Sequence, residues 1–125
     1  MSDTIEMIGG LPGFETCRKF QLLTAPEIAP FARLQGLDAP QPSFLTMPPR
    51  AIVGSYRQEL ADADRLKLGA DTDDALLWLS IVRIDGDVAY ANLRAPIVIN
   101  PRRMVGLQVL SADEHEQIDH ALRLD

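Results

Sequence analysis

Short stretches of alternating apolar and polar residues recur along the chain, separated by proline, glycine and aspartate. Alternation with a period of two places every second side chain on one face, which is typical of half-buried β-strands. The predicted strands are residues 19–23, 31–37, 43–47, 52–60, 75–84, 88–93, 97–99 and 106–110. Many short strands with turns between them predict a mainly β fold: a small antiparallel β-barrel or sandwich-like barrel with one or two short helices.

The strongest strand signal is residues 75–84, which are rich in β-branched and aromatic side chains. The Asp85-Gly86 pair that follows is typical of a type I′ hairpin turn, and residues 88–93 then form the return strand. Trp78 and Val82 fall on one face of the first strand and Leu79 on the other. Because both faces are largely apolar, we expect this hairpin to lie centrally and to be covered on two sides.

Helices are expected at two places. Residues 62–68 predict a short helix with an aspartate cap, and Gly69 ends it. In the tail, Ser111 and Glu114 have the spacing of a capping box, which predicts a short C-terminal helix within residues 110–125.

Prolines punctuate the rest of the chain. Residues 43–47 are flanked by prolines that bar a helix across this region, namely Pro40, Pro42, Pro48 and Pro49. Pro96 interrupts the stretch AYANLRAPIVIN, residues 89–100. Since proline cannot donate a ladder hydrogen bond, we expect Ala95-Pro96 to form a barrel corner, with Arg94 and Asn100 fixing the turns on either side.

Length and charge restrict the function. A chain of 125 residues has the size of one domain, which we assign to residues 1–125. Its formal net charge of −6 repels phosphate backbones and anionic lipids, so we expect no nucleic-acid or membrane partner. The single cysteine, Cys17, fits a reducing compartment. Without a signal peptide or a long apolar run, the chain is expected to stay in the cytoplasm.

Catalytic and metal-binding patterns are weak throughout. Ser55 lacks the second glycine of a nucleophile elbow. His115 and His120 are five residues apart, which is a poor spacing for a shared metal on a helix. The acidic run at 71–74 lacks the glycine and glutamate of a calcium loop. We therefore expect no enzyme, no metal site and no cofactor.

The remaining candidate site is an acidic surface. We define the acidic rim as Glu59, Asp62, Asp64, Asp71, Asp73 and Asp74. A run of carboxylates can steer a basic protein partner, although most such runs are solvated faces without a partner. Both interpretations stay open from the sequence.

Two motifs, in this order and spacing, resemble the FliW family of flagellar assembly factors. The first motif is Gly10, Leu11, Pro12, Gly13 and Phe14. The second contains Asn92, Leu93, Ala95, Pro96, Ile97, Val98, Ile99 and Asn100. With a strand-like segment at 56–60 between them, the resemblance covers about residues 5–110.

The resemblance implies a small β-barrel without enzymatic activity or cofactor. It also implies a cytoplasmic protein with two alternative partners, flagellin and the RNA-binding translational regulator CsrA. When flagellin is exported, the freed factor binds CsrA and relieves repression of the flagellin message.

Two departures from the family pattern carry their own expectations. Only nine residues precede the Gly10 turn, where family members have a full strand, so we expect an open sheet edge there. The tail from Ser111 is more helical than the family's usual ending, which leaves open a divergent paralogue that acts as a structural interaction module. A further alternative is a barrel that binds a small ligand in its mouth near Arg33, Tyr56 or Arg94.

Overall fold

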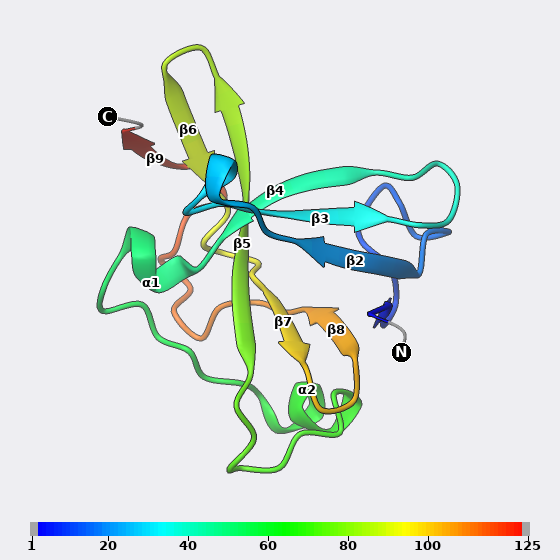
Figure 1. Cartoon of the computed structure of the whole chain (residues 1–125). Helices are drawn as coiled ribbons and strands as arrows, with labels where there is room; N and C mark the ends of the chain where they lie inside the picture. The colour runs from blue at the N-terminus through cyan, green and yellow to red at the C-terminus, as the bar shows by residue number, and fades with distance from the viewer. Residues whose placement is uncertain (1–2, 124–125) are drawn as a thin grey trace.

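The computed structural model describes residues 3–123 as a barrel with a projecting hairpin (Figure 1). The strands are β1 (Ile5–Met7), β2 (Lys19–Leu23), β3 (Ala32–Gly36), β4 (Ser43–Met47), β5 (Leu77–Asp85), β6 (Val88–Ala91), β7 (Ile97–Asn100), β8 (Val105–Gln108) and β9 (His120–Arg123). The helices are η1 (Pro26–Ile28), α1 (Pro49–Ile52) and α2 (Asp62–Lys67). The predicted mainly β class with short helices is confirmed.

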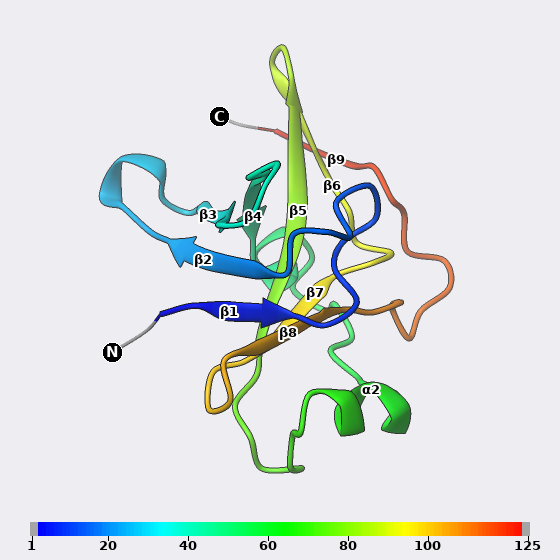
Figure 2. The ribbon, with the colours of Figure 1, turned by 90° about the vertical axis from the view of Figure 1, so that its right-hand side faces the viewer.

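Seven strands close into a ring in the order β4-β3-β2-β1-β8-β7-β5, and β5 pairs back to β4. All pairs are antiparallel except β1 with β8, where Glu6 lies opposite Val105 and Met7 opposite Gly106. This parallel pair closes the barrel on the N-terminal side, and Figure 2 shows the two strands side by side. The expectation of an open edge there is wrong, because three residues of β1 suffice to bridge β2 and β8.

Strand β5 lies at the centre of the sheet, as its two apolar faces predicted, but the hairpin as a whole is not covered on two sides as expected, because residues 83–88 at its tip are exposed. Its first part, Leu77–Leu79, pairs with β7, and its last part, Val82–Asp85, pairs with β6 on the same edge. The hairpin is confirmed, but its turn differs from the prediction. Gly86 has a φ of +62° while Asp87 keeps a negative φ, which fits a type II′ turn with glycine first.

The two faces of β5 enter different apolar clusters. The barrel interior holds the buried residues Ile5, Met7, Leu11, Cys17, Phe20, Leu34, Leu79, Ile97 and Ile99. The outer face carries Trp78, which packs with Tyr56, Leu68 and Leu93 beneath the segment 49–76. This division explains why the sequence of β5 is apolar in both registers.

The segment 49–76 crosses the outside of the barrel as two short helices and a loop. The predicted strand at 52–60 is wrong: its apolar side chains all pack toward the outer cluster around Tyr56, so they do not alternate between two faces. The region flanked by the prolines contains no helix, as predicted: residues 43–47 form β4, and Pro49 begins α1 only after this strand, at a position that needs no N–H partner.

Helix α2 is confirmed, with a different N-cap from the one predicted. Ala61 is the N-cap residue and makes no side-chain cap hydrogen bond. Gly69 ends the helix as predicted, with a φ of +58°. The amides of Gly69 and Ala70 bond the carbonyls of Leu66 and Arg65, the pattern of a Schellman motif.

The predicted C-terminal helix is wrong over residues 110–123, and residues 124–125 lie outside the described part of the chain. Residues 111–119 form turns, and β9 then pairs with all four residues of β6. The Ser111 hydroxyl accepts the amide of Asp113 rather than that of Glu114, so no capping box forms. The carbonyls of Ser111, Asp113 and Gln117, which a helix would use internally, accept hydrogen bonds from residues 93 and 94. Over residues 3–123, no helix is long and apolar enough to cross a bilayer.

Candidate functional site

The segment Asn92–Pro96 is the corner at which the return strand leaves the projecting hairpin and enters the barrel (Figure 1). The Asn92 side-chain oxygen accepts the amides of Arg94 at 3.1 Å and Ala95 at 2.9 Å. Pro96 is buried directly before β7, at a position where its missing N–H leaves no gap in the ladder. This corner splits one potential strand into β6 and β7, both of which pair with the same edge of β5.

Arg94 ties the corner to the C-terminal segment. We call residues 111–119 the C-terminal strap. The Arg94 guanidinium donates to the carbonyls of Ser111 at 3.0 Å and Asp113 at 3.3 Å. The amides of Leu93 and Arg94 both donate to the carbonyl of Gln117. These contacts fix the strap through its backbone, and none of them involves its carboxylates.

Tyr56, in the outer apolar cluster, forms a hydrogen bond to the same corner. Its side chain is 2% exposed, and its hydroxyl donates to the carbonyl of Leu93 at 2.6 Å. Burial raises the pKa of Tyr56, and a hydrogen bond with the Ser111 side chain opposes that shift. The neutral hydroxyl is therefore the form that the folded protein favours.

The far end of the same motif holds helix α2. Asn100 is fully buried, and its amide donates to the carbonyl of Leu68 at 2.9 Å. Its side-chain oxygen accepts the amide of Arg102 at 3.2 Å. Arg102 and Arg103 each donate to the carbonyl of Gly69, at 3.1 and 3.0 Å. The end of α2 is therefore anchored on the β7–β8 turn.

Three of the six carboxylates of the acidic rim, those of Glu59, Asp71 and Asp74, form ion pairs. Arg102 lies 2.9 Å from Asp74 and 3.6 Å from Asp71. Glu59 pairs with Arg57 at 2.8 Å. The hydrogen bond from Arg102 lowers the pKa of Asp74, and the hydrogen bond from Arg57 lowers that of Glu59.

Two of the other three rim carboxylates share helix α2 with basic residues. Asp62 and Asp64 occupy the first turn of α2, while Arg65 and Lys67 occupy its last turn. Asp62 lines a surface hollow of about 340 Å³ together with the side chains of Arg65 and Arg103. Asp73 is exposed in the loop before β5. The rim is therefore a surface of mixed charge.

A second acidic region was missed by the sequence analysis. The strap carries Asp113, Glu114, Glu116 and Asp119 and contains no lysine or arginine. Among the side chains that the structure describes, none of these carboxylates lies within ion-pair distance of a basic group. The four acids were visible in the sequence, but Ser111 and Glu114 were interpreted as the caps of a helix.

The Gly10–Phe14 motif forms a tight turn at the end of β1. Gly10 has a φ of +68°, and a side chain there would meet the Glu15 backbone at 2.7 Å. Leu11 is buried, and the Phe14 ring meets Phe44 edge-on with centroids 5.5 Å apart. The motif therefore packs a loop against the barrel.

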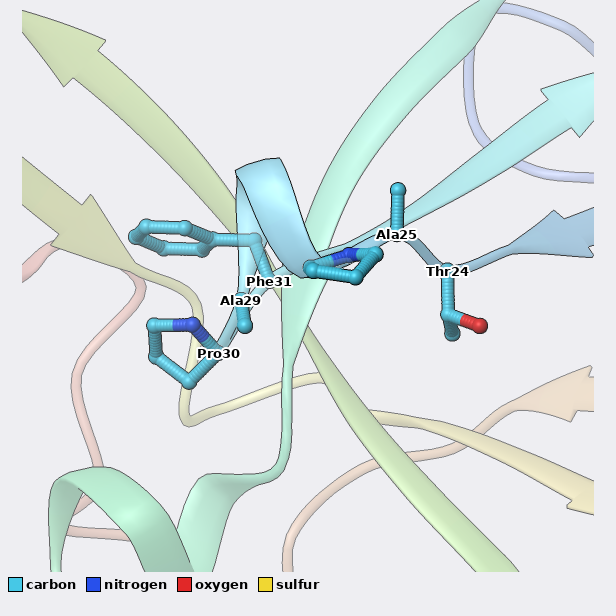
Figure 3. Close-up of a pocket in the computed structure, with 6 residues that line it drawn as sticks. Thr24, Ala25, Ala29, Pro30 and Phe31 are labelled. Carbon is cyan, nitrogen blue, oxygen red and sulfur yellow. The ribbon is translucent and has the colours of Figure 1, made fainter.

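The residues of the suggested ligand-binding mouth do not converge. Arg33 is exposed on β3, where it donates to Ser43, while Tyr56 and Arg94 lie at the corner described above. A surface hollow of about 400 Å³ is formed by η1 and its flanks, and Figure 3 shows the residues that line it. It is lined by Thr24, Ala25, Pro26, Ala29, Pro30 and Phe31. Ser55 is exposed, and no cluster of metal-ligating side chains occurs among the residues searched, which are the described ones.

Comparisons with known proteins agree on one family. The family model described as FliW protein matches residues 1–122. The chain is 30% identical over 116 residues to the flagellar assembly factor FliW of Thermotoga petrophila, covering 90% of this chain and 78% of the relative. It is 34% identical over 122 residues to that of Geobacillus kaustophilus, covering 96% and 84%.

The fold agrees as well. The chain superimposes on a crystal structure of the flagellar assembly factor FliW with a TM-score of 0.87 and 29% sequence identity. The match covers 98% of this chain and 86% of the other. The chain therefore belongs to the FliW family of flagellar assembly factors.

Proposed function

We propose that this protein controls flagellin synthesis by binding two alternative protein partners, flagellin and a CsrA-type RNA-binding regulator. The observation that carries the proposal is the family match over residues 1–122 together with the TM-score of 0.87. In this scheme free flagellin occupies the factor while filaments are not growing. Export of flagellin frees the factor, which then sequesters the regulator and permits translation of the flagellin message.

The setting for this cycle is the cytoplasm, where flagellin is translated. The net charge of −6 supports the choice of a basic regulator as partner, since opposite charge accelerates the encounter of two proteins. The same charge disfavours direct contact with the message itself. The protein acts on translation through the regulator.

We further propose that the acidic rim contributes to the approach of the basic partner. Asp62, Asp64 and Asp73 form no ion pair among the described side chains and are the rim groups free to do so. Asp71, Asp74 and Glu59 are engaged by arginines of this chain and contribute less. Steering of this kind weakens as salt is added.

Calorimetric titration tests the proposal. The protein is titrated with the purified CsrA-type regulator and, separately, with flagellin from the same genome. We expect binding in the micromolar range or tighter with both, and competition when all three are mixed. Absence of binding to both by a folded sample would contradict the proposal, and simultaneous binding without competition would contradict the switch.

A further inference from the structure

The sheet ends at β9, whose outer edge pairs with no other strand in residues 3–123. Figure 1 shows β9 alongside β6 on the hairpin that projects from the barrel. An exposed row of backbone N–H and C=O groups is a template on which another strand can pair. The edge therefore offers a physical basis for binding an extended segment.

The hairpin register determines which backbone groups face outward. Asp85 and Val88 close a two-residue turn, so they form a hydrogen-bonded pair and Val88 points its backbone groups to β5. Alternation then directs the backbone groups of Ala89 and Ala91 to β9. The amide of Asn92 donates to Ile81 on β5, as this alternation requires.

The same alternation applies to β9. Leu122 lies opposite Ala89 and His120 opposite Ala91, so these two residues bond to β6. The backbone groups of Ala121 and Arg123 consequently point away from the sheet. They are the donors and acceptors that an added strand would meet.

Apolar surface accompanies the open edge. A groove of about 310 Å³ lies beside it, lined by Asp87, Val88, Ala121 and Leu122. Val88 is 37% exposed, and Ile118, two residues before β9, is 68% exposed. An added strand would cover these side chains.

The charge around the edge selects the partner. The strap that leads into β9 carries four carboxylates without ion pairs among the described side chains. Asp85 and Asp87 add further negative charge at the hairpin turn, where Asp85 lies 3.9 Å from Arg83. A second copy of this chain would bring the same acidic strap to the interface, and like charges there oppose pairing.

We propose that the β9 edge binds an extended segment of a partner protein in which apolar side chains alternate with lysine or arginine. The segment adds a strand through the backbone of Ala121 and Arg123, its apolar side chains enter the groove, and its basic side chains meet the strap. This inference rests on the proposed function and deepens it by naming the surface that a partner uses.

The backbone part of the inference is tested with a fluorescein-labelled peptide of four Val-Lys repeats, measured by fluorescence anisotropy. Ala121→Pro removes the outward N–H and leaves the ladder with β6 intact. We expect about tenfold weaker binding than wild type, since the variant loses an interfacial hydrogen bond and its partner group stays unpaired. The matched control, Ala121→Val, retains the N–H and should bind as wild type does.

The charge part uses a second variant that does not depend on backbone geometry. Glu114→Gln with Asp119→Asn should weaken binding of the Val-Lys peptide and flatten its salt dependence. The control, Asp62→Asn with Asp73→Asn, removes the same number of charges from the rim and should change binding less. A peptide of four Val-Glu repeats should not bind.

The outcomes separate this inference from the proposed function. Failure of wild type to bind the Val-Lys peptide, or equal binding by folded Ala121→Pro, would overturn the inference. So would a wild-type dimer in analytical ultracentrifugation that Ala121→Pro disrupts, since the edge would then belong to a second copy. If wild type binds the peptide through this edge but binds neither flagellin nor the regulator, the proposed function fails while the edge remains a binding surface.

Discussion

Two acidic segments lie at opposite ends of one motif and are held in different ways. At one end, Arg102 reaches the carboxylates of Asp71 and Asp74, so the tether also neutralises the charge. At the other end, Arg94 donates to backbone carbonyls of the strap, so the tether leaves its carboxylates unpaired. The segment Asn92–Arg102 therefore binds Asp71 and Asp74 of the acidic rim through their carboxylates and binds the strap through its backbone, which gives the two regions different electrostatic roles.

This difference shows that a count of acids does not measure the charge available to a partner. The rim has the more conspicuous acidic sequence, yet arginines from this chain lie among its carboxylates. The strap has four acids and is bound through its backbone. Available charge depends on which atoms the anchoring arginine contacts, and that is a property of the fold.

The largest loss of stability is expected at Asn100, near the end of the segment Asn92–Arg102 that contacts α2 and the rim. Asn100→Ala removes buried hydrogen bonds and leaves the carbonyl of Leu68 without its donor. We expect the free energy of unfolding in urea to fall by about 2 kcal/mol. Gln108→Ala, which removes a half-buried amide that donates to Ala95, should cost less. Equal losses would contradict the assigned importance of Asn100.

Substitution of Arg94, at the end of this segment that contacts the strap, should cause a somewhat smaller loss of stability. Arg94→Met keeps much of the aliphatic stem and removes the two hydrogen bonds to the strap carbonyls. We expect about 1.5 kcal/mol of destabilisation. Hydrogen exchange should accelerate at residues 111–123 before it does in the barrel, because the strap opens locally. Uniform acceleration across the barrel would show that Arg94 does not act through the strap.

Tyr56 gives a prediction with a pH signature. Tyr56→Phe removes the hydrogen bond to Leu93 and should cost about 1 kcal/mol at neutral pH. Since burial raises the pKa of Tyr56 in the folded state, its contribution is present below the unfolded pKa of about 10 and is lost as pH rises through the folded pKa.

Urea denaturation between neutral and alkaline pH measures this effect. Wild type should lose stability in that range faster than Tyr56→Phe does. Tyr90→Phe serves as a control for the loss of a tyrosine hydroxyl at another position. The Tyr90 ring packs against the guanidinium of Arg83, which lies 4.5 Å from the ring centroid. A wild-type stability that runs parallel to that of Tyr56→Phe would contradict the buried, neutral hydroxyl.

The smallest effect compares one carboxylate from each region. Asp74 has a lowered pKa, chiefly through its hydrogen bond with Arg102, so it stabilises the fold above its ordinary pKa of about 4. Asp74→Asn should lower the melting temperature slightly at neutral pH, and the difference should vanish as pH falls through the lowered pKa. Glu114→Gln should leave the melting temperature unchanged. A larger loss for Glu114→Gln would contradict the unpaired state of the strap.

The sequence predicted much of the barrel because its strands follow local rules. Residues 19–23 and 43–47 form strands with the expected bounds, and the apolar faces of β5 revealed its central place. It failed where tertiary contacts overrode local pattern. The strap has a helix-like sequence, but Arg94 and the amides of the corner engage its carbonyls.

The candidate site was predicted only in part. The Asn92–Asn100 motif drew attention to the corner, and the acids of the rim were visible as a run. Nothing in the sequence indicated that residues 111–119 return to the corner, because that contact depends on β9 pairing with β6 far away in the chain. The open edge at Ala121 follows from the same pairing and was equally hidden.

The most direct test is amide hydrogen exchange of the full chain, alone and in complex with the purified CsrA-type regulator or flagellin. With at least one of these partners, we predict protection of the amides of Ala121 and Arg123, which point out of the sheet, and of the strap, with little change in α2 and the rim. Complexes that form and protect α2 and the rim while leaving Ala121 and Arg123 unprotected would contradict the account.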